Sequence, residues 1–359
     1  MNTAEASKGT FSLLDILAER HSLSVQEYRT VIEGFSAETM EYAESLADSL
    51  RRCYYDNTVF IRGLIEISSY CHNDCFYCGL RRSNSRCQRY TLTEREILEC
   101  CDEGYRLGFR TFVLQGGEHA DEDALRICHT VRKIKSGWPD CAVTLSLGEY
   151  PRSIYQALFD AGADRYLLRH ETADREHYKK LHPPRMSFDN RMRCLCDLQE
   201  IGFQAGCGFM VGSPFQTPGT LAEDLKFIED YRPAMCGIGP FIPQRDTPFG
   251  RMPAGSRDMT LYLLSILRIM HPGMLIPSTT ALSTVDSDAH CKGIRAGANV
   301  IMPNLSPEGV RKKYALYDGK ACSGSEAAEG LSKLKSDMEK TGYRIVVSRG
   351  DPAVLNNNV

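Results

Sequence analysis

Short runs of apolar, β-branched residues alternate along this chain with longer stretches in which apolar positions recur every three or four residues. The first pattern is typical of buried strands and the second of amphipathic helices. The strand-like runs cover residues 59–68, 110–115, 141–147, 165–170, 203–211, 235–241, 274–279 and 298–303. Eight strand–helix units in one uninterrupted chain predict an α/β fold, a full (β/α)8 barrel of the TIM type. An open, doubly wound sheet is the alternative, because periodicity does not show closure.

Capping signals and amphipathic stretches divide the chain further. Thr93 is followed three residues later by Glu96, which is the capping-box pattern of a helix start. The first 50 or so residues read as helices that cover one end of the barrel. We therefore predict an N-terminal helical extension over residues 1–50, a barrel over 51–322 and a C-terminal helical tail over 323–359.

One cysteine-rich run directly follows the first predicted strand. The sequence CHNDCFYC places Cys71, Cys75 and Cys78 in a Cys-x3-Cys-x2-Cys spacing. Three thiolates on a tight loop can hold three irons of a 4Fe-4S cluster and leave the fourth iron open, since such clusters normally take four cysteines. Reduced structural thiols and a zinc site are the alternatives. Structural zinc favours paired Cys-x2-Cys ligands, no second pair follows, and His72 is badly placed to be a fourth ligand.

Composition and charge narrow the class of partner. The chain has 359 residues, 42% hydrophobic and 25% charged, with a net charge of −3. These values are ordinary for a globular protein and predict neither nucleic-acid nor membrane binding, so a small-molecule partner is expected. No apolar run approaches the roughly 20 residues of a membrane span, and the start does not resemble a signal peptide. We expect a cytoplasmic protein.

The CHNDCFYC loop, together with QGGE after the second strand, resembles the radical S-adenosylmethionine (SAM) enzymes. More closely, the blocks IRGLIEISSYC, CGLRRSN, VTLSLGE, GADRYLLRHETA, GIGPFIP, DTP, PSTTA and GANVIMPN resemble the HydE family of FeFe-hydrogenase maturases. The resemblance runs from Ile61 to Asn304 and on to Tyr314, so it covers most of the chain.

The resemblance implies one 4Fe-4S cluster on the three cysteines and S-adenosyl-L-methionine as cofactor. An electron from the reduced cluster then breaks a carbon–sulfur bond of SAM and yields a 5′-deoxyadenosyl radical. The implied substrate is a cysteine-ligated iron carbonyl-cyanide complex, attacked at sulfur. The implied partners are the maturases HydG and HydF and a reductant such as ferredoxin or flavodoxin.

The resemblance also assigns site residues. Those expected to bind SAM are Tyr77, Gly116, Gly117, Arg169, Glu171 and Arg191. Those expected to line the barrel interior and bind substrate are Arg62, Thr144, Arg165, Met235, Thr279, Thr280 and Tyr314. Because cations on barrel strands are costly unless they face an anion or a partner, we expect Arg62 and Arg165 to bind the carboxylate of an amino-acid-like substrate. The structural alternatives are a strand-end turn at the glycines, a surface ion pair between Arg169 and Glu171, and core packing for Met235.

Two positions depart from the family pattern. Many relatives carry a second cluster motif near the C-terminus, Cys-x7-Cys-x2-Cys, but here only Cys322 is kept, and Gly330 and Lys333 occupy the other two positions. No second cluster is therefore expected. Gly116 stands where relatives often have a serine that contacts the substrate cavity, which leaves that contact in doubt.

Three other functions fit parts of this pattern. Methylornithine synthase, an amino-acid mutase, and biotin synthase share the implied barrel and cluster, although LRHET and GIGPFIP favour HydE over both. A non-catalytic iron-sulfur carrier or scaffold would need no SAM site. A zinc-dependent barrel hydrolase would need His and Asp ligand sets at the strand ends, which the sequence lacks.

Overall fold

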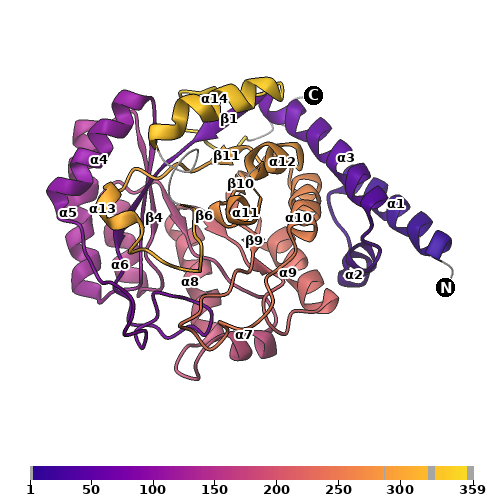
Figure 1. Cartoon of the computed structure of the whole chain (residues 1–359), viewed down its shortest axis with the longest axis horizontal. Coiled ribbons are helices and arrows are strands. Elements are labelled where there is room, and N and C mark those ends of the chain that lie inside the picture. Colours follow the sequence, from indigo (N-terminus) through magenta and orange to yellow (C-terminus); the bar gives the residue numbers. More distant parts are fainter. Residues whose placement is uncertain (1–2, 287, 322–327, 354–359) are drawn as a thin grey trace.

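The computed structural model describes residues 3–286, 288–321 and 328–353 and shows strands surrounded by helices (Figure 1). The strands are β1 (Thr58–Ile61), β2 (Gly63–Ser68), β3 (Thr111–Gly116), β4 (Ala142–Ser146), β5 (Arg165–Leu167), β6 (Gln204–Cys207), β7 (Met210–Val211), β8 (Met235–Cys236), β9 (Gly239–Pro240), β10 (Pro277–Ser278), β11 (Val300–Ile301) and β12 (Arg344–Val346). The helices are α1 (Thr3–Arg20), α2 (Val25–Glu33), α3 (Ala37–Tyr55), α4 (Glu94–Leu107), α5 (Asp121–Gly137), α6 (Arg152–Asp160), α7 (Arg175–Leu181), α8 (Phe188–Ile201), α9 (Pro218–Tyr231), α10 (Arg257–Met270), α11 (Thr280–Val285), α12 (Ala289–Arg295), α13 (Glu308–Arg311), the 3-10 turn η2 (Ala328–Gly330) and α14 (Leu331–Lys340).

Parallel pairing closes the strands into a barrel. One sheet runs β2-β3-β4-β5-β6-β8, and a second contains β10, β11 and β1 in that order. A parallel bridge between Met235 and Leu275 joins the two sheets on one side, and a bridge between Leu64 and Asn304 joins them on the other. The predicted barrel is therefore confirmed, and the open sheet is excluded.

All eight predicted strand runs contain strands, but three of them are divided. The first run divides at Arg62, because β1 pairs with β11 whereas β2 pairs with β3. The fifth run divides at Gly208, where a Cβ would lie 2.1 Å from the carbonyl oxygen of Gly237. Changes of neighbour and close backbone approaches of this kind depend on the closed barrel, so local periodicity does not reveal them.

Helix starts follow the local sequence signals. Thr93 caps α4, and the capping box with Glu96 is present as predicted. In the N-terminal helical extension, α2 packs against α9 and α3 against α10, on the outside of the barrel (Figure 1). Within the described residues, no helix is long and apolar enough to cross a membrane.

The C-terminal part of the chain returns to the barrel. It contains η2, α14 and strand β12, which pairs in parallel with β1. Residues 348–353 then pass the end of the barrel at which the strands begin. The predicted boundary at residue 322 thus separates β12 from a sheet to which it is hydrogen-bonded.

Candidate active site

The three-cysteine loop leaves the carboxyl end of β2, where active sites of this architecture collect. The backbone N–H groups of Asn73 and Glu118 both donate to Sγ of Cys71, each over 3.4 Å. Burial raises the pKa of Cys71, and it raises that of Cys78 to about 12. The pKa of Cys75 is raised well above its ordinary value by burial and by the thiols of Cys78 and Cys71. The three cysteines are partly buried, and bound cations such as iron would stabilise their thiolates by compensating the charge.

The chemistry of this loop differs from that of a site for one ion. Among the residues that the structure describes, no group of three or more His, Cys, Asp or Glu side chains could hold a single metal ion. A 4Fe-4S cluster requires another geometry, because each thiolate binds its own iron. The spacing of Cys71, Cys75 and Cys78 suits such a cluster, because each thiolate can bind a different iron.

The two glycines after β3 are not equivalent. A Cβ on Gly117 would lie 2.0 Å from the carbonyl oxygen of Tyr70 and 2.7 Å from Cβ of Cys71. A Cβ on Gly116 would meet side-chain atoms of Ile67 and Leu147 at 3.4 Å and the carbonyl oxygen of Ser68 at 3.6 Å, all ordinary contact distances. Glycine at position 117 thus lets the β3 exit pass directly over the first cysteine, whereas position 116 has room for a side chain.

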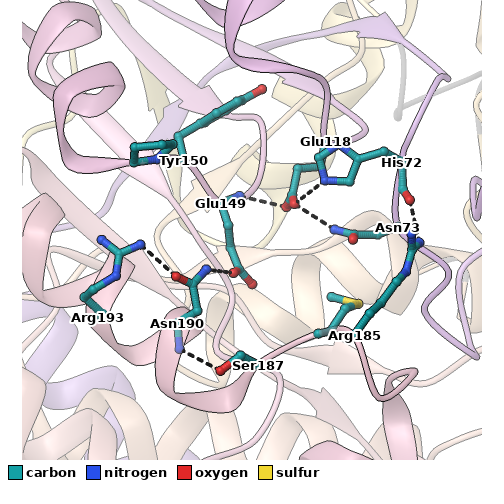
Figure 2. Close-up of a pocket in the computed structure, with 11 residues that line it drawn as sticks. His72, Asn73, Glu118, Glu149, Tyr150, Arg185, Ser187, Asn190 and Arg193 are labelled. Atoms are coloured by element: carbon teal, nitrogen blue, oxygen red, sulfur yellow. Dashed lines mark hydrogen bonds and ion pairs between the residues drawn. The ribbon is translucent and has the colours of Figure 1, made fainter.

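A cavity of about 350 Å³ lies beside the cysteine loop, and Glu118 is its central polar group (Figure 2). Oε1 of Glu118 pairs with Nε2 of His72 at 2.9 Å and accepts from Nδ2 of Asn73 at 2.8 Å, while Oε2 accepts from the N–H of Glu149 at 2.7 Å. Burial alone would raise the pKa of Glu118, but the His72 hydrogen bond and the charge of Arg191 outweigh it and lower the pKa. Glu118 thus ties the cysteine loop to the exits of β3 and β4.

Arg169 and Glu171 follow β5 and have unused bonding capacity. Nη2 of Arg169 and Oε2 of Glu171 form an ion pair at 3.1 Å. Beyond that pair, these two buried atoms and Nε of Arg169 make no hydrogen bond among the described residues. Glu171 also has a positive φ of 66°, a strained conformation for a residue that is not glycine. Buried polar groups are normally hydrogen-bonded, so these atoms indicate a missing polar ligand.

Arg191 comes from α8 and is engaged within the chain. Its Nε donates to Oε1 of Glu149 at 2.6 Å, and its Nη1 donates to the carbonyl oxygen of Arg169 at 2.8 Å. Its charge reaches Cys75 and Tyr77, since it opposes the rise in pKa of both groups. Arg191 thus holds the strand exit that carries Arg169.

Tyr77 lies on the cysteine loop and packs edge-on against His182, with its hydroxyl 3.1 Å from Nε2 of that ring. Burial, followed by the charge of Arg191, lowers the pKa of His182 to about 3, so the ring is neutral at any working pH. A neutral imidazole can accept the hydrogen bond of the Tyr77 hydroxyl and keep the tyrosine on the loop in one orientation.

The predicted substrate residues lie at different depths of the barrel. Arg62 is fully buried, and it donates to Sδ of Met235 at 2.9 Å and to the carbonyl oxygen of Gly350 at 3.3 Å. Its Nε has no partner, and no described carboxylate lies within ion-pair distance of it. Oγ1 of Thr144, on β4, is likewise buried without a partner. Arg165, in contrast, is already paired with a carboxylate of the same chain, that of Asp351, at 2.5 Å.

The remaining predicted substrate residues lie toward the other end of the strands. Tyr314 is buried, and its hydroxyl accepts from Nε2 of Gln115 at 3.4 Å. Thr279 precedes the first residue of α11, Thr280, and donates to the carbonyl oxygen of Ile238 at 3.3 Å. The structure thus places the predicted substrate residues on the barrel strands and in the segments that follow them. Arg62 and Arg165 lie apart from Thr279, Thr280 and Tyr314.

A buried ion pair went unnoticed at the sequence level. Glu66 on β2 is wholly buried, pairs with Nζ of Lys320, and accepts from Nδ2 of Asn304 at 3.0 Å. The Lys320 ammonium also lies 5.0 Å from the centre of the Tyr314 ring. A carboxylate in the middle of an apolar strand was the available signal, because such a charge is costly unless it is paired.

Comparison with known proteins agrees with this geometry. A family model described as the radical SAM superfamily matches residues 65–228. The chain is 46% identical over 277 residues to the FeFe-hydrogenase maturase subunit HydE of Thermotoga maritima, which covers 77% of this chain and 79% of the relative. It is 30% identical to 3-methylornithine synthase of Methanosarcina barkeri, over 86% of this chain and 87% of the relative.

Two solved structures share the fold. Methylornithine synthase (PylB) superposes with a TM-score of 0.83 at 27% identity, covering 93% of this chain and 97% of that one. The maturase HydG superposes with a TM-score of 0.79 at 18% identity, covering 96% and 78%. The barrel and its three-cysteine loop thus define a radical SAM enzyme, a class that uses a 4Fe-4S cluster and SAM. Within that class, the chain belongs to the HydE family of FeFe-hydrogenase maturases.

Proposed function

We propose that this enzyme acts in the assembly of the FeFe-hydrogenase active site on a cysteine-ligated iron carbonyl-cyanide precursor. The observation that carries the proposal is the 46% identity to HydE of Thermotoga maritima across most of both chains. Apart from their mutual ion pair, the buried atoms Nε and Nη2 of Arg169 and Oε2 of Glu171 make no hydrogen bond among the described residues, which supports a polar cofactor at the exit of β5.

The cysteines, Gly117, Arg169 and Glu171 have different roles in the proposed cofactor site. Cys71, Cys75 and Cys78 would hold the cluster, which together with SAM supplies a one-electron bond cleavage and a 5′-deoxyadenosyl radical. Gly117 keeps the β3 exit close to the first cysteine, where a side chain would collide. Arg169 and Glu171, which pair with each other at 3.1 Å, would bind charged or hydroxyl groups of SAM with the buried atoms that make no hydrogen bond within the described residues.

The remaining three predicted cofactor residues are Arg191, Tyr77 and Gly116. Arg191 holds the backbone of Arg169 through its carbonyl oxygen, and it is itself held by Glu149. Tyr77 is oriented by His182 on the cysteine loop. Gly116 has room for a side chain, so its contact with SAM would use the backbone.

Within the barrel, Arg62 is the group best suited to a substrate anion. A wholly buried guanidinium without a paired carboxylate is unfavourable, so an incoming anion would gain a strong charge-assisted contact there. Thr144 offers a free hydroxyl on β4. Met235, Thr279, Thr280 and Tyr314 stay predicted substrate residues, and Arg165 would need to exchange Asp351 for a substrate carboxylate.

The proposal includes one cluster only. Cys322 lies outside the described residues, Gly330 lies in η2, and Lys333 lies on α14, where its ammonium pairs with Asp337 at 2.5 Å. Neither glycine nor a lysine ammonium is a cluster ligand. HydG, HydF and a ferredoxin or flavodoxin reductant are the proposed protein partners, and the cytoplasm is the proposed compartment.

The direct test is anaerobic reconstitution followed by electron paramagnetic resonance (EPR) of the reduced protein with and without SAM. We expect one 4Fe-4S signal that changes with SAM, formation of 5′-deoxyadenosine, and loss of both when Cys71, Cys75 and Cys78 are changed to Ala. A cluster whose signal ignores SAM would instead identify an iron-sulfur carrier or scaffold. No cluster at all would refute the proposal.

A second candidate reaction is the rearrangement of an amino acid, as in methylornithine synthase. It is favoured by the 30% sequence identity to that enzyme and by the TM-score of 0.83 to its structure. The two functions differ in substrate, so SAM cleavage stimulated by a free amino acid, with 3-methylornithine as the product, would support the mutase. Stimulation by a cysteine-ligated iron complex would support the maturase.

A further inference from the structure

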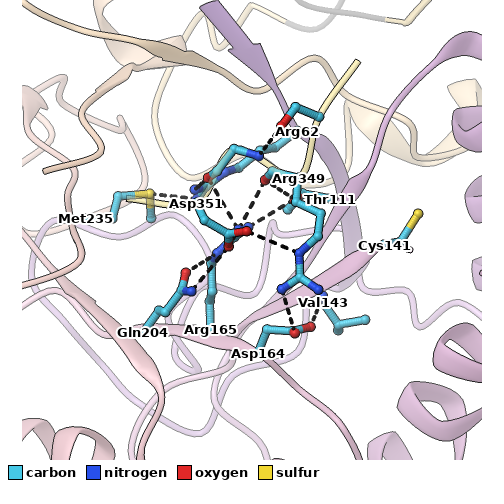
Figure 3. Close-up of polar contacts among 12 residues, drawn as sticks. Arg62, Thr111, Cys141, Val143, Asp164, Arg165, Gln204, Met235, Arg349 and Asp351 are labelled. Atoms are coloured by element: carbon cyan, nitrogen blue, oxygen red, sulfur yellow. Dashed lines mark hydrogen bonds and ion pairs between the residues drawn. The ribbon is translucent and has the colours of Figure 1, made fainter. Parts of the chain in front are cut away.

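The C-terminal segment of residues 348–353 lies across the end of the barrel at which the strands begin, opposite to the cysteine loop. Figure 3 shows how its polar groups converge on the arginines of the barrel interior. The carbonyl oxygen of Arg349 accepts from Oγ1 of Thr111 at 2.7 Å and from Nη2 of Arg165 at 3.1 Å. The next carbonyl oxygen, that of Gly350, accepts from both Arg165 and Arg62 at 3.3 Å. We name residues 348–353 the C-terminal strap.

Asp351 is one of two charged contacts between the strap and the barrel, and the other joins Arg349 to Asp164 at 2.9 Å. Oδ1 of Asp351 accepts from Nη2 of Arg165 at 2.5 Å and from Nε2 of Gln204 at 3.2 Å. The Arg165 side chain is 3% exposed, and its Nε and Nη1 donate to Gln204 and Thr111. The Asp351 side chain is 44% exposed. The buried partner of this ion pair thus belongs to the barrel, and the exposed partner belongs to the strap.

Few apolar groups hold the strap in place. Of its residues only Gly350 is buried, where a positive φ of 61° and the ring of Phe60, 2.7 Å from a would-be Cβ, both favour glycine. Asp351 is exposed, and the other four residues are partly exposed. A segment bound mainly through polar contacts can detach without unfolding the core, since little apolar surface is lost.

An anion inside the barrel and the strap would use the same two side chains. Arg62 gives one N–H to the carbonyl oxygen of Gly350 and keeps Nε unbonded. Nη2 of Arg165 donates hydrogen bonds only to groups of the strap within the described residues. A carboxylate that approached these guanidinium groups from the barrel would compete with the carboxylate of Asp351 and the carbonyl of Gly350.

We propose that the C-terminal strap is a latch over the end of the barrel at which the strands begin. The Arg165–Asp351 ion pair closes this latch, and an anion that binds Arg62 and Arg165 from inside the barrel releases it. The strap would then open a second route to the interior, away from the cysteine loop. A groove of about 1010 Å³ lies outside this opening and is lined in part by Pro352 and Ala353 of the strap. The latch depends only on groups of this chain, so it stands or falls independently of the proposed function.

Trypsin cleavage after Arg349 measures the opening, because a protease cuts a bond only when its segment is locally released. The full chain is digested and the release of the fragment beginning at Gly350 is followed by mass spectrometry. Arg165→Gln breaks the ion pair without altering the cleaved sequence, and Asp351→Asn breaks it from the other side. A peptide of residues 344–355, with and without the Asn, corrects for the intrinsic preference of the protease.

We expect both variants to speed cleavage about tenfold or more, the effect of losing one hydrogen bond between charged groups. Asp337→Asn removes a carboxylate on α14 that does not touch the strap, and it should leave the rate unchanged. Should Asp351→Asn fold but be cut no faster than the wild type, after the peptide correction, the latch is refuted. A wild-type rate equal to that of the free peptide would refute it as well.

Sodium acetate tests the competition with a carboxylate. It should speed cleavage after Arg349 in the wild type but not in Arg62→Gln, while neutral acetamide should have no effect in either protein. If acetate leaves the wild-type rate unchanged, or accelerates both proteins equally, the anion does not act through Arg62 and the release step of the proposal is overturned. Neither result depends on SAM cleavage.

Discussion

Gly117→Ala tests the packing on which the cysteine loop depends. The added methyl group would lie 2.0 Å from the carbonyl oxygen of Tyr70 and 2.7 Å from Cβ of Cys71. Non-bonded heavy atoms normally stay about 3.5 Å apart, so the loop would have to move by about 1.5 Å at Tyr70 and by about 1 Å at Cys71. Both obstacles lie on or next to the backbone, and no side-chain rotation relieves them. We expect a cost near the upper end of the 1–3 kcal/mol typical of overpacking, about 3 kcal/mol.

The displaced group is a predicted cluster ligand, so iron binding is the sharper measurement. Metal ligands tolerate errors of only about 0.2 Å, far less than the movement that the alanine demands of Cys71. After anaerobic reconstitution, Gly117→Ala should hold clearly less iron per chain than the wild type, and its EPR signal should be weakened or absent. The denaturation midpoint of each protein, measured in parallel, separates lost cluster from lost fold.

Gly116→Ala is the matched control. Neither glycine has a positive φ, so the two substitutions differ only in the space around the new methyl group. At position 116 the nearest atoms are 3.4 Å away, which is an ordinary contact. We expect full iron content and a stability change within about 0.5 kcal/mol. If Gly117→Ala binds as much iron as Gly116→Ala and responds to SAM, the steric reasoning is wrong.

Three further predictions concern charges. Glu171→Gln should weaken SAM binding about tenfold or more, as expected for the loss of a charge-assisted bond. An unchanged affinity for SAM in a spectral titration would show that Glu171 does not bind SAM. Glu66→Gln should lower the free energy of unfolding by about 3 kcal/mol, because Lys320 would stay buried and unpaired, and Lys320→Met in the same chain should recover part of that loss in denaturant titrations. Burial holds the pKa of His271 at about 4, below its ordinary value. The contribution of the neutral ring to the free energy of unfolding is therefore fully present above about pH 6.5 and is lost as the pH falls toward 4. Wild type should therefore lose about 1 kcal/mol more than His271→Gln between about pH 6.5 and 5, and equal losses would contradict the prediction.

Much of the fold and of the reactive loop could be predicted from local sequence. Buried parallel strands form continuous apolar runs, and the helices between them carry a 3.6-residue period, so both are visible without tertiary information. The spacing of Cys71, Cys75 and Cys78 is equally local, because one short loop carries all three thiols. The resemblance gave Gly117 as a residue expected to bind SAM, and its close contact with the cysteine loop appeared only in three dimensions.

Partners of the charged residues could not be predicted in the same way. Arg165 meets Asp351, which is 186 residues away in the sequence, and Glu66 meets Lys320 at a separation of 254. The cost of burying a charge indicates that a partner exists, but it does not say whether the partner is a ligand or another part of the chain. For Arg165 it is the chain itself, and for Arg62 no carboxylate is supplied within the described residues.

The sequence by itself therefore determined the class of fold, the order of its elements and the three-thiol loop, because each is encoded by neighbouring residues. Only the tertiary structure decided that the barrel closes, that β12 pairs with β1, and that the C-terminal strap meets the interior arginines. These features join segments far apart in the chain. Hydrogen-bonding geometry and packing in the folded state select such contacts, and no local pattern of residues specifies them.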